Sequence, residues 1–197
     1  MSHQHELEEL IKNNGGLIRT RQAEEHGVPR KYLSMMSHAG HLERLSQGIY
    51  LSPDAYEDRL FRLQFRCEPG VFSHETALFL LGLSDREPQI IMMTVPSGYN
   101  AQHLTEEPMK MFYIRKELLG LGRSTAETAF KRSVQCYDRE RTLCDVLRSR
   151  SKMDPALVNQ AFKIYLKSTV KNIPLLFDYS SKLGVLKQVR NYLEVLL

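Results

Sequence analysis

Apolar residues near the start of the chain recur at the three- and four-residue spacing of short amphipathic helices. Leu7, Leu10 and Ile11 give one apolar face to a helix over roughly residues 3–13, and Asn14-Gly15-Gly16 ends it. A second apolar series runs through residues 19–38 and is interrupted by a glycine. The pattern therefore predicts three short helices in this part of the chain.

The interrupted series has the residues that a helix-turn-helix requires. Ala23 supplies the small side chain that two closely crossing helices need, and Gly27 supplies the positive φ of a sharp turn four residues later. Val28, Leu33 and Met36 then fall where apolar side chains hold the second helix against the core. The spacing predicts a helix-turn-helix whose second helix directly follows the turn.

A hairpin is expected next. Two short apolar runs, residues 42–45 and 49–51, flank Ser46-Gln47-Gly48, and glycine in a tight reversal between such runs is typical of a β-hairpin. A hairpin after a helix-turn-helix forms a wing. We therefore predict a winged helix-turn-helix domain over residues 1–52, a class of domain that places its second helix in the major groove of double-stranded DNA.

The DNA-contacting side chains are predicted from the positions that face away from this core. Thr20, at the start of the first helix of the motif, is expected to contact a phosphate, and Arg44 and Gln47 place the wing on the neighbouring backbone. The second helix presents its polar and amphipathic residues to the bases: Arg30, Lys31, Tyr32 and Ser34 near its start, with Ser37 and His38 near its far end.

The remaining residues, 53–197, predict a second domain that is α+β with a largely helical end. Short apolar runs at residues 89–95, 109–114 and 134–137 indicate strands. Helical patterns cover residues 54–66, a segment that Ser73 caps and Gly82 ends, and most of the chain from residue 138. The whole chain is therefore expected to be α+β and mainly helical, with one domain at 1–52 and another at 53–197.

Charge is unevenly distributed between these parts. Residues 1–50 carry no net charge, residues 51–109 carry −5 and residues 110–197 carry +9, for a total of +4. A polyanion is attracted to the last of these segments, where cations outnumber carboxylates by about two to one. The cations expected to share a DNA-backbone face are Arg141, Arg148, Lys163, Lys167, Lys187 and Arg190.

Composition limits the environment and the chemistry. The chain has no apolar run long enough to span a membrane and begins with an acidic segment rather than a signal peptide, so we expect a cytoplasmic protein without membrane contact. Three cysteines without CxxC spacing are expected to be reduced core thiols. No glycine-rich phosphate loop, GxSxG elbow or zincin spacing is present, so we predict no cofactor, no metal and no enzymatic activity.

One enzymatic alternative stays open. The carboxylates Asp138, Glu140 and Asp145 lie close together in the sequence and could hold the metal of a nuclease. The competing interpretation is structural: Asp138 caps a helix, Glu140 occupies its first turn, and Asp145 pairs with Arg141 or Arg148. We favour the structural interpretation.

Several stretches of the chain resemble the AbiEi family of antitoxins, from the type IV toxin–antitoxin systems linked to bacterial abortive infection. They are GGLIRTRQAEEHGVPRKYLSMMSHAGHLERLSQGIY in the first domain, and FSHETALFLLGLSD, TVPSGY and YDRERTLCDVLRSR in the second. The resemblance covers nearly the whole chain. It implies a repressor of its own toxin–antitoxin operon in phage defence, which binds an inverted-repeat operator as two copies and counteracts a nucleotidyltransferase-like toxin.

Neutralisation in this family is described as not requiring a stable toxin–antitoxin complex, so the resemblance leaves direct contact with the toxin open. The alternative to DNA binding is accordingly a protein-interaction module, in which the winged helix and the basic domain bind an acidic toxin directly.

Overall fold

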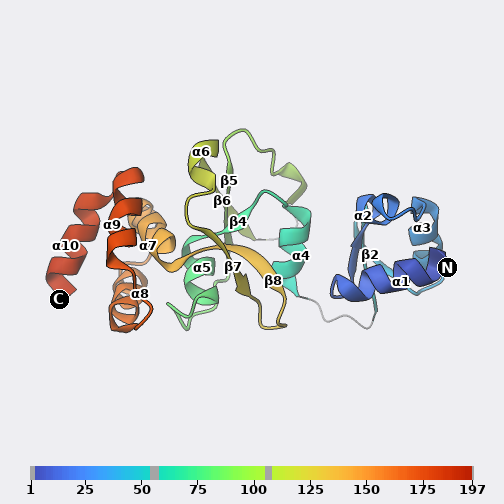
Figure 1. Cartoon of the computed structure of the whole chain (residues 1–197), viewed down its shortest axis with the longest axis horizontal. Coiled ribbons are helices and arrows are strands. Elements are labelled where there is room, and N and C mark those ends of the chain that lie inside the picture. The colour runs from blue at the N-terminus through green and yellow to red at the C-terminus, as the bar shows by residue number, and fades with distance from the viewer. Residues whose placement is uncertain (1–2, 54–57, 105–107, 197) are drawn as a thin grey trace. The chain divides into compact units, whose positions relative to one another are not determined.

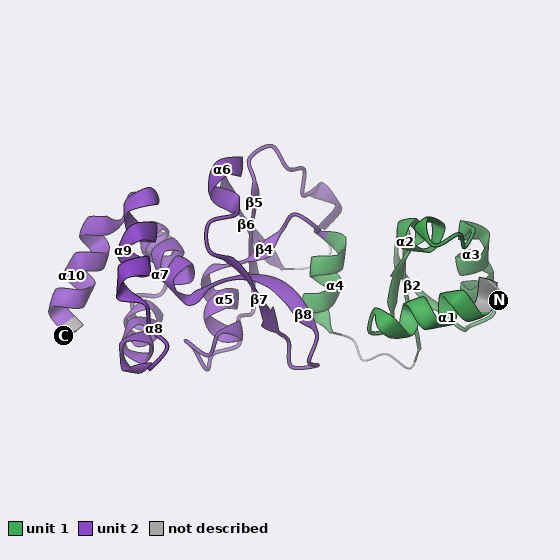
Figure 2. Ribbon diagram, viewed as in Figure 1, with its two compact units in different colours: residues 1–66 green, residues 67–197 purple. Residues whose placement is uncertain are grey.

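A computed structural model describes residues 3–53, 58–104 and 108–196 of the chain, which form two compact units (Figures 1 and 2). The first unit comprises residues 1–66 and the second residues 67–197. The mixed α+β fold class that the sequence predicts is confirmed. No helix in the described part of the chain has the length and apolar character needed to cross a bilayer.

The first unit contains the three predicted N-terminal helices: α1 (His3–Asn13), α2 (Thr20–Glu25) and α3 (Arg30–His38). Between α2 and α3 the chain reverses at Gly27, whose φ of +77° is a conformation that a side chain disfavours. The Val28 amide donates to the Ala23 carbonyl at 2.8 Å and closes the turn. Ala23, Val28 and Leu33 are fully buried, so α2 and α3 are held together on their inner sides.

The sheet of this unit has three antiparallel strands in the order β1-β3-β2: β1 (Leu17–Arg19), β2 (Glu43–Ser46) and β3 (Ile49–Leu51). The predicted two-stranded hairpin is present, but β1, a three-residue strand too short to produce a sequence pattern, adds a third strand on the other edge of β3. Helix α4 (Arg59–Arg66) packs Phe61 and Phe65 against the apolar face of this sheet, which extends the unit past the predicted boundary at residue 52. The part of the predicted 54–66 helix at residues 54–57 lies outside the described residues.

The second unit is built on a five-stranded mixed sheet in the order β6-β5-β4-β8-β7. Its strands are β4 (Val71–Phe72), β5 (Ile91–Pro96), β6 (Met109–Ile114), β7 (Arg123–Glu127) and β8 (Ser133–Tyr137). The β4–β8 and β5–β6 pairs are parallel, and the β4–β5 and β7–β8 pairs are antiparallel. The three apolar runs of the sequence correspond to β5, β6 and β8. The short β4 and the exposed β7 lack such a run and were not predicted.

Helix α7 (Arg139–Arg148) is the centre of the second unit and packs against α5, α8, α9 and α10. The other helices are α5 (His74–Leu80), α6 (Lys116–Leu119), α8 (Pro155–Lys167), α9 (Ile173–Lys182) and α10 (Leu186–Leu196), with single 3-10 turns at Gln102–Leu104 and Arg150–Lys152. The side chains of Asp138, Asp154 and Asn172 accept hydrogen bonds from backbone amides at the starts of α7, α8 and α9. The three cysteines, Cys67, Cys136 and Cys144, are buried in the core, as predicted.

Candidate nucleic-acid interface

Helix α3 has one buried side and one exposed side. Leu33 and Met36 are buried in the core of the first unit, whereas Arg30, Lys31 and Ser34 are exposed. The first turn of α3 contains no acidic residue, and its N-cap is Pro29, whose side chain makes no capping bond. Two cations therefore add to the positive end of the helix dipole, an arrangement that favours negatively charged groups.

The other predicted contact residues of α3 occupy different environments. His38 is exposed at the far end of the helix, whereas Tyr32 and Ser37 are half-buried. Tyr32 packs against the core cluster, and the Lys31 ammonium lies 5.7 Å from the centre of its ring. The Tyr32 ring thus makes a cation–π contact with Lys31, and its exposed part belongs to the surface of α3.

The hairpin turn and the start of α2 are joined by hydrogen bonds. The Thr20 amide donates to the Gly48 carbonyl at 2.9 Å, and the Thr20 hydroxyl donates to the same oxygen at 3.4 Å. Thr20 is consequently half-buried, while Arg44 and Gln47 are exposed. The bonds fix the hairpin tip beside the start of α2.

Met35 belongs to the exposed side of α3 and was not predicted. Its side chain is 58% exposed, although methionine is usually buried. It lies one residue after Ser34 and three before His38, so it shares the surface that these polar residues form. The helical period could have revealed it, because the apolar stripe of α3 is already complete with Leu33 and Met36.

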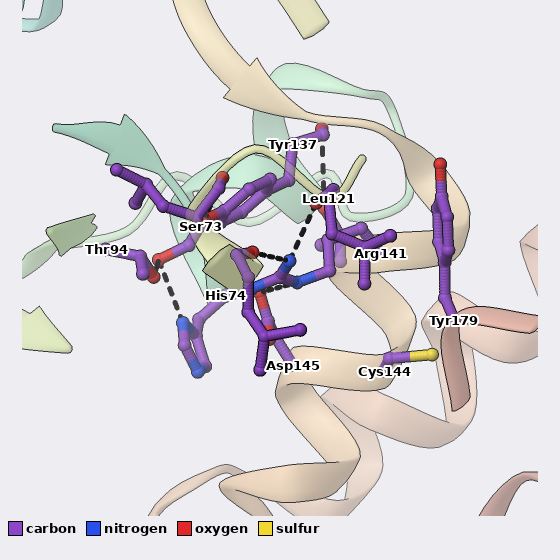
Figure 3. A network of polar contacts seen from close by, with 12 residues as sticks. Ser73, His74, Thr94, Leu121, Tyr137, Arg141, Cys144, Asp145 and Tyr179 are labelled. Atoms are coloured by element: carbon purple, nitrogen blue, oxygen red, sulfur yellow. Dashed lines mark hydrogen bonds and ion pairs between the residues drawn. The ribbon is translucent and has the colours of Figure 1, made fainter. Parts of the chain in front are cut away.

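The prediction that Arg141 belongs to the exposed basic face is wrong. Its side chain is fully buried. Nε donates to Asp145 Oδ2 at 3.0 Å and Nη1 donates to the Leu121 carbonyl at 2.7 Å (Figure 3). Nη1 also donates to the Leu118 carbonyl at 2.9 Å. The guanidinium also stacks over Tyr137, 4.1 Å from the ring centre. Arg141 is therefore not available to contact DNA. The carboxylate, the carbonyl oxygens and the ring around it offset the desolvation cost of burying its charge.

The remaining five cations of that prediction are exposed. Arg148 ends α7, Lys163 and Lys167 lie one turn apart on α8, and Lys187 and Arg190 lie one turn apart on α10. Each of the two pairs shares one helix face.

The three carboxylates of the nuclease alternative have different partners. Asp138 accepts from the Arg141 amide and the Tyr179 hydroxyl, Glu140 accepts from the Tyr165 hydroxyl and the Asn172 amide, and Asp145 accepts from Arg141. Across the described ranges, no three His, Cys, Asp or Glu side chains are grouped as a metal site would require. The predicted structural roles of Asp138, Glu140 and Asp145 are confirmed.

Comparison with known proteins finds a family match within the first unit. Residues 5–53, about a quarter of the chain, match the family described as "Transcriptional regulator, AbiEi antitoxin", which confirms the resemblance over this segment. The family is one of regulators rather than of enzymes. A search of curated proteins finds no match.

A solved structure similar to this one is that of the RV2827C protein from Mycobacterium tuberculosis. The two chains are 14% identical with a TM-score of 0.53, and the superposition covers 95% of this chain and 78% of the other. At this identity the similarity shows a shared fold.

Proposed function

We propose that the protein is a DNA-binding antitoxin that represses its own toxin–antitoxin operon and counteracts a nucleotidyltransferase-like toxin. The observation that carries the proposal is the two-sided construction of α3, which is anchored by Leu33 and Met36 and exposes Arg30, Lys31 and Ser34. The match of residues 5–53 to a family of antitoxin regulators supports the same function.

In this proposal the first unit acts as a winged helix-turn-helix and α3 enters the major groove. Nine residues of α-helix extend about 13 Å, comparable to the roughly 12 Å width of that groove. Arg30 and Lys31 at the start of α3 read base edges, while Arg44 and Gln47 on the hairpin contact the adjacent backbone. Two copies bind one inverted-repeat operator, each reading a half-site.

The exposed cations of α8 and α10 supply phosphate contacts outside the half-site. Such contacts add affinity without sequence preference and weaken as salt concentration rises. In this proposal the nearly neutral first unit recognises the DNA sequence, and the second unit provides most of the electrostatic attraction to DNA.

The direct test measures binding of the full chain to the DNA upstream of its own operon and to a scrambled duplex. Arg30→Ala should cost about 1–3 kcal/mol on the operator and reduce the preference over scrambled DNA, because a bidentate contact to a guanine edge is lost. Lys12→Ala is the control, since it removes one exposed cation from α1. Unchanged discrimination by the Arg30 variant contradicts the proposed role of α3.

A second measurement addresses the basic helices. Replacing Lys163 and Lys167 together by alanine should reduce the slope of log K against log salt by about 1–2 for every sequence tested. Lys182→Ala serves as control, because the Lys182 ammonium already pairs with Asp178 at 2.7 Å. Equal slopes for the double variant and the wild type exclude these two lysines from the interface.

A further inference from the structure

The second unit contains a cavity of about 210 Å³ beside the end of α7. Its polar wall is formed by His74, Thr94, Asp145, Arg148 and Ser149, and Phe112 and Tyr113 of β6 contribute aromatic surface. The residues come from α5, β5, β6 and α7, so only the folded sheet and helix assemble them. None of these side chains belongs to the proposed surface on α3.

His74 is held in an unusual conformation at this cavity. It is 3% exposed, its φ is +52°, and its ring stacks on Phe112 with centroids 3.5 Å apart. A positive φ is uncommon at a non-glycine residue, and residues held in such strained conformations cluster at functional sites. Hydrogen bonds hold both ring nitrogens, Nδ1 to Ser73 Oγ at 2.9 Å and Nε2 to Ser149 Oγ at 3.0 Å.

The hydrogen bonds around His74 leave a donor for a ligand. Thr94 Oγ1 donates to Ser73 Oγ at 2.9 Å, so the Ser73 proton is left for Nδ1 of His74 (Figure 3). We therefore assign the single proton of the neutral imidazole to Nε2, which then donates to Ser149 Oγ. The Ser149 hydroxyl therefore retains its own proton for a group inside the cavity.

The charges near the cavity are positive overall. The Asp145 carboxylate is paired with Arg141, which leaves Arg148 and the nearby Lys110 uncompensated by that pair. Burial, together with the charges of Lys110, Arg141 and Arg148, lowers the pKa of His74 to about 3, so its imidazole is neutral at cellular pH. The Arg148 guanidinium is exposed and lines the cavity. An anion is the ligand that these charges favour.

We propose that this cavity binds a phosphate monoester. The Arg148 guanidinium and the Ser149 hydroxyl donate to the phosphate oxygens, and Tyr113, 52% exposed at the rim, contacts the group that the phosphate bears. The volume is below the roughly 300–1,000 Å³ of a pocket for a drug-sized ligand, which suits a phosphate group. The phosphate belongs either to a free mononucleotide or to the terminus of a nucleic-acid strand.

The test measures binding of the full chain by calorimetry to four probes: inorganic phosphate, adenosine 5′-monophosphate, a short single strand with a 5′-phosphate, and the same strand without a 5′-phosphate. We expect at least one phosphate monoester to bind. Arg148→Gln should weaken that binding about tenfold or more, because a charge-assisted hydrogen bond is lost. Arg150→Gln is the matched control: it removes the same charge two residues away, outside the cavity lining, and should change affinity less than about twofold.

The probes also separate the two sources of phosphate. Binding of the mononucleotide without any preference for the 5′-phosphorylated strand assigns a free nucleotide, and a preference that Arg148→Gln abolishes assigns a strand terminus. Ser149→Ala should weaken the same binding and also lower the thermal midpoint somewhat, because Nε2 of the buried His74 loses its acceptor. Absence of mononucleotide binding at about 10 mM together with no preference for the 5′-phosphorylated strand, or equal losses in the Arg148 and Arg150 variants, overturns the proposal.

Discussion

Helices α3 and α7 are similar in length and both carry arginine near their starts, yet the two units use them in opposite ways. α3 is covered on one side only, and its Arg30 is exposed. In α7 every residue from Glu140 to Leu147 is buried, Arg141 completely. A helix packed on one side can bind a partner, whereas a helix surrounded by neighbours uses its charges to hold the core together.

The contrast has an energetic consequence. A solvated arginine such as Arg30 contributes little to folding and can be removed without loss of structure. A buried ion pair such as Arg141–Asp145 contributes a modest net stability, but removing one partner leaves an uncompensated charge in the core. Substitutions in the two helices should therefore separate into binding effects and folding effects.

The largest effect is expected at the buried pair. Arg141→Met should lower the free energy of unfolding by about 3–5 kcal/mol, because Asp145 is left without its cation. Urea denaturation of this variant and of Lys163→Met, which changes an exposed residue, measures the difference. Adding Asp145→Leu to Arg141→Met should restore much of the loss. A loss below about 1 kcal/mol for the single variant would contradict the buried role of Arg141.

The next effect concerns the loop that receives the Arg141 side chain. Gly122 has φ +71°, and a Cβ there would lie 2.5 Å from Arg141 Cβ. Gly122→Ala should cost about 2–3 kcal/mol through strain and collision. Gly120 has a φ of −76° and open space around it, so Gly120→Ala should be nearly neutral. Similar thermal midpoints for the two variants would show that the loop accommodates the added methyl group at residue 122 without loss of stability.

An intermediate effect should appear in the pH dependence of stability. Burial lowers the pKa of His74 from 6.5 to about 3, so its contribution to the free energy of unfolding is lost as pH falls below 6.5. Burial raises the pKa of Asp145 from 3.8 to about 6, so its contribution to the free energy of unfolding is lost as pH rises from 3.8 to about 6. The two slopes oppose each other between about pH 4 and 6.

Variants should separate the two slopes. Acidification from pH 6 to pH 4 should destabilise Asp145→Asn more than wild type, and should stabilise His74→Gln relative to its own value at pH 6. The expected changes are on the order of 1–3 kcal/mol. Urea denaturation at several pH values measures the slopes, and identical slopes in all three proteins would contradict the buried titration of both groups.

The smallest effect is expected on the exposed side of α3, and it depends on the proposed function. Met35→Ala should weaken operator binding by about 1 kcal/mol or less, because an apolar side chain in the major groove contacts the methyl group of thymine. Replacing operator thymines by uracil should remove the difference between wild type and variant. A difference that persists on uracil-containing DNA excludes methyl recognition while leaving the role of Arg30 intact.

The sequence predicted most of the first unit because its elements are local. Each signal involves only residues close to it in the sequence: the glycine at 27, the apolar positions on α3, and the turn at Gly48. Spacing alone therefore located the helices and the hairpin. Strands β5, β6 and β8 were found for the same reason. β1 and β4, of three and two residues, form only by pairing with strands elsewhere in the chain and leave no periodic pattern.

The sequence by itself thus determined the α+β class, the starts of the main helices and the exposure of Arg30, Lys31, Ser34 and His38 on α3. Tertiary structure alone decided the burial of Arg141 and the contact between His74 and Ser149, which are 75 positions apart. The reason is physical: capping and amphipathic periodicity act over one or two turns, whereas the environment of a charged side chain depends on which distant carbonyls, carboxylates and rings the fold places around it.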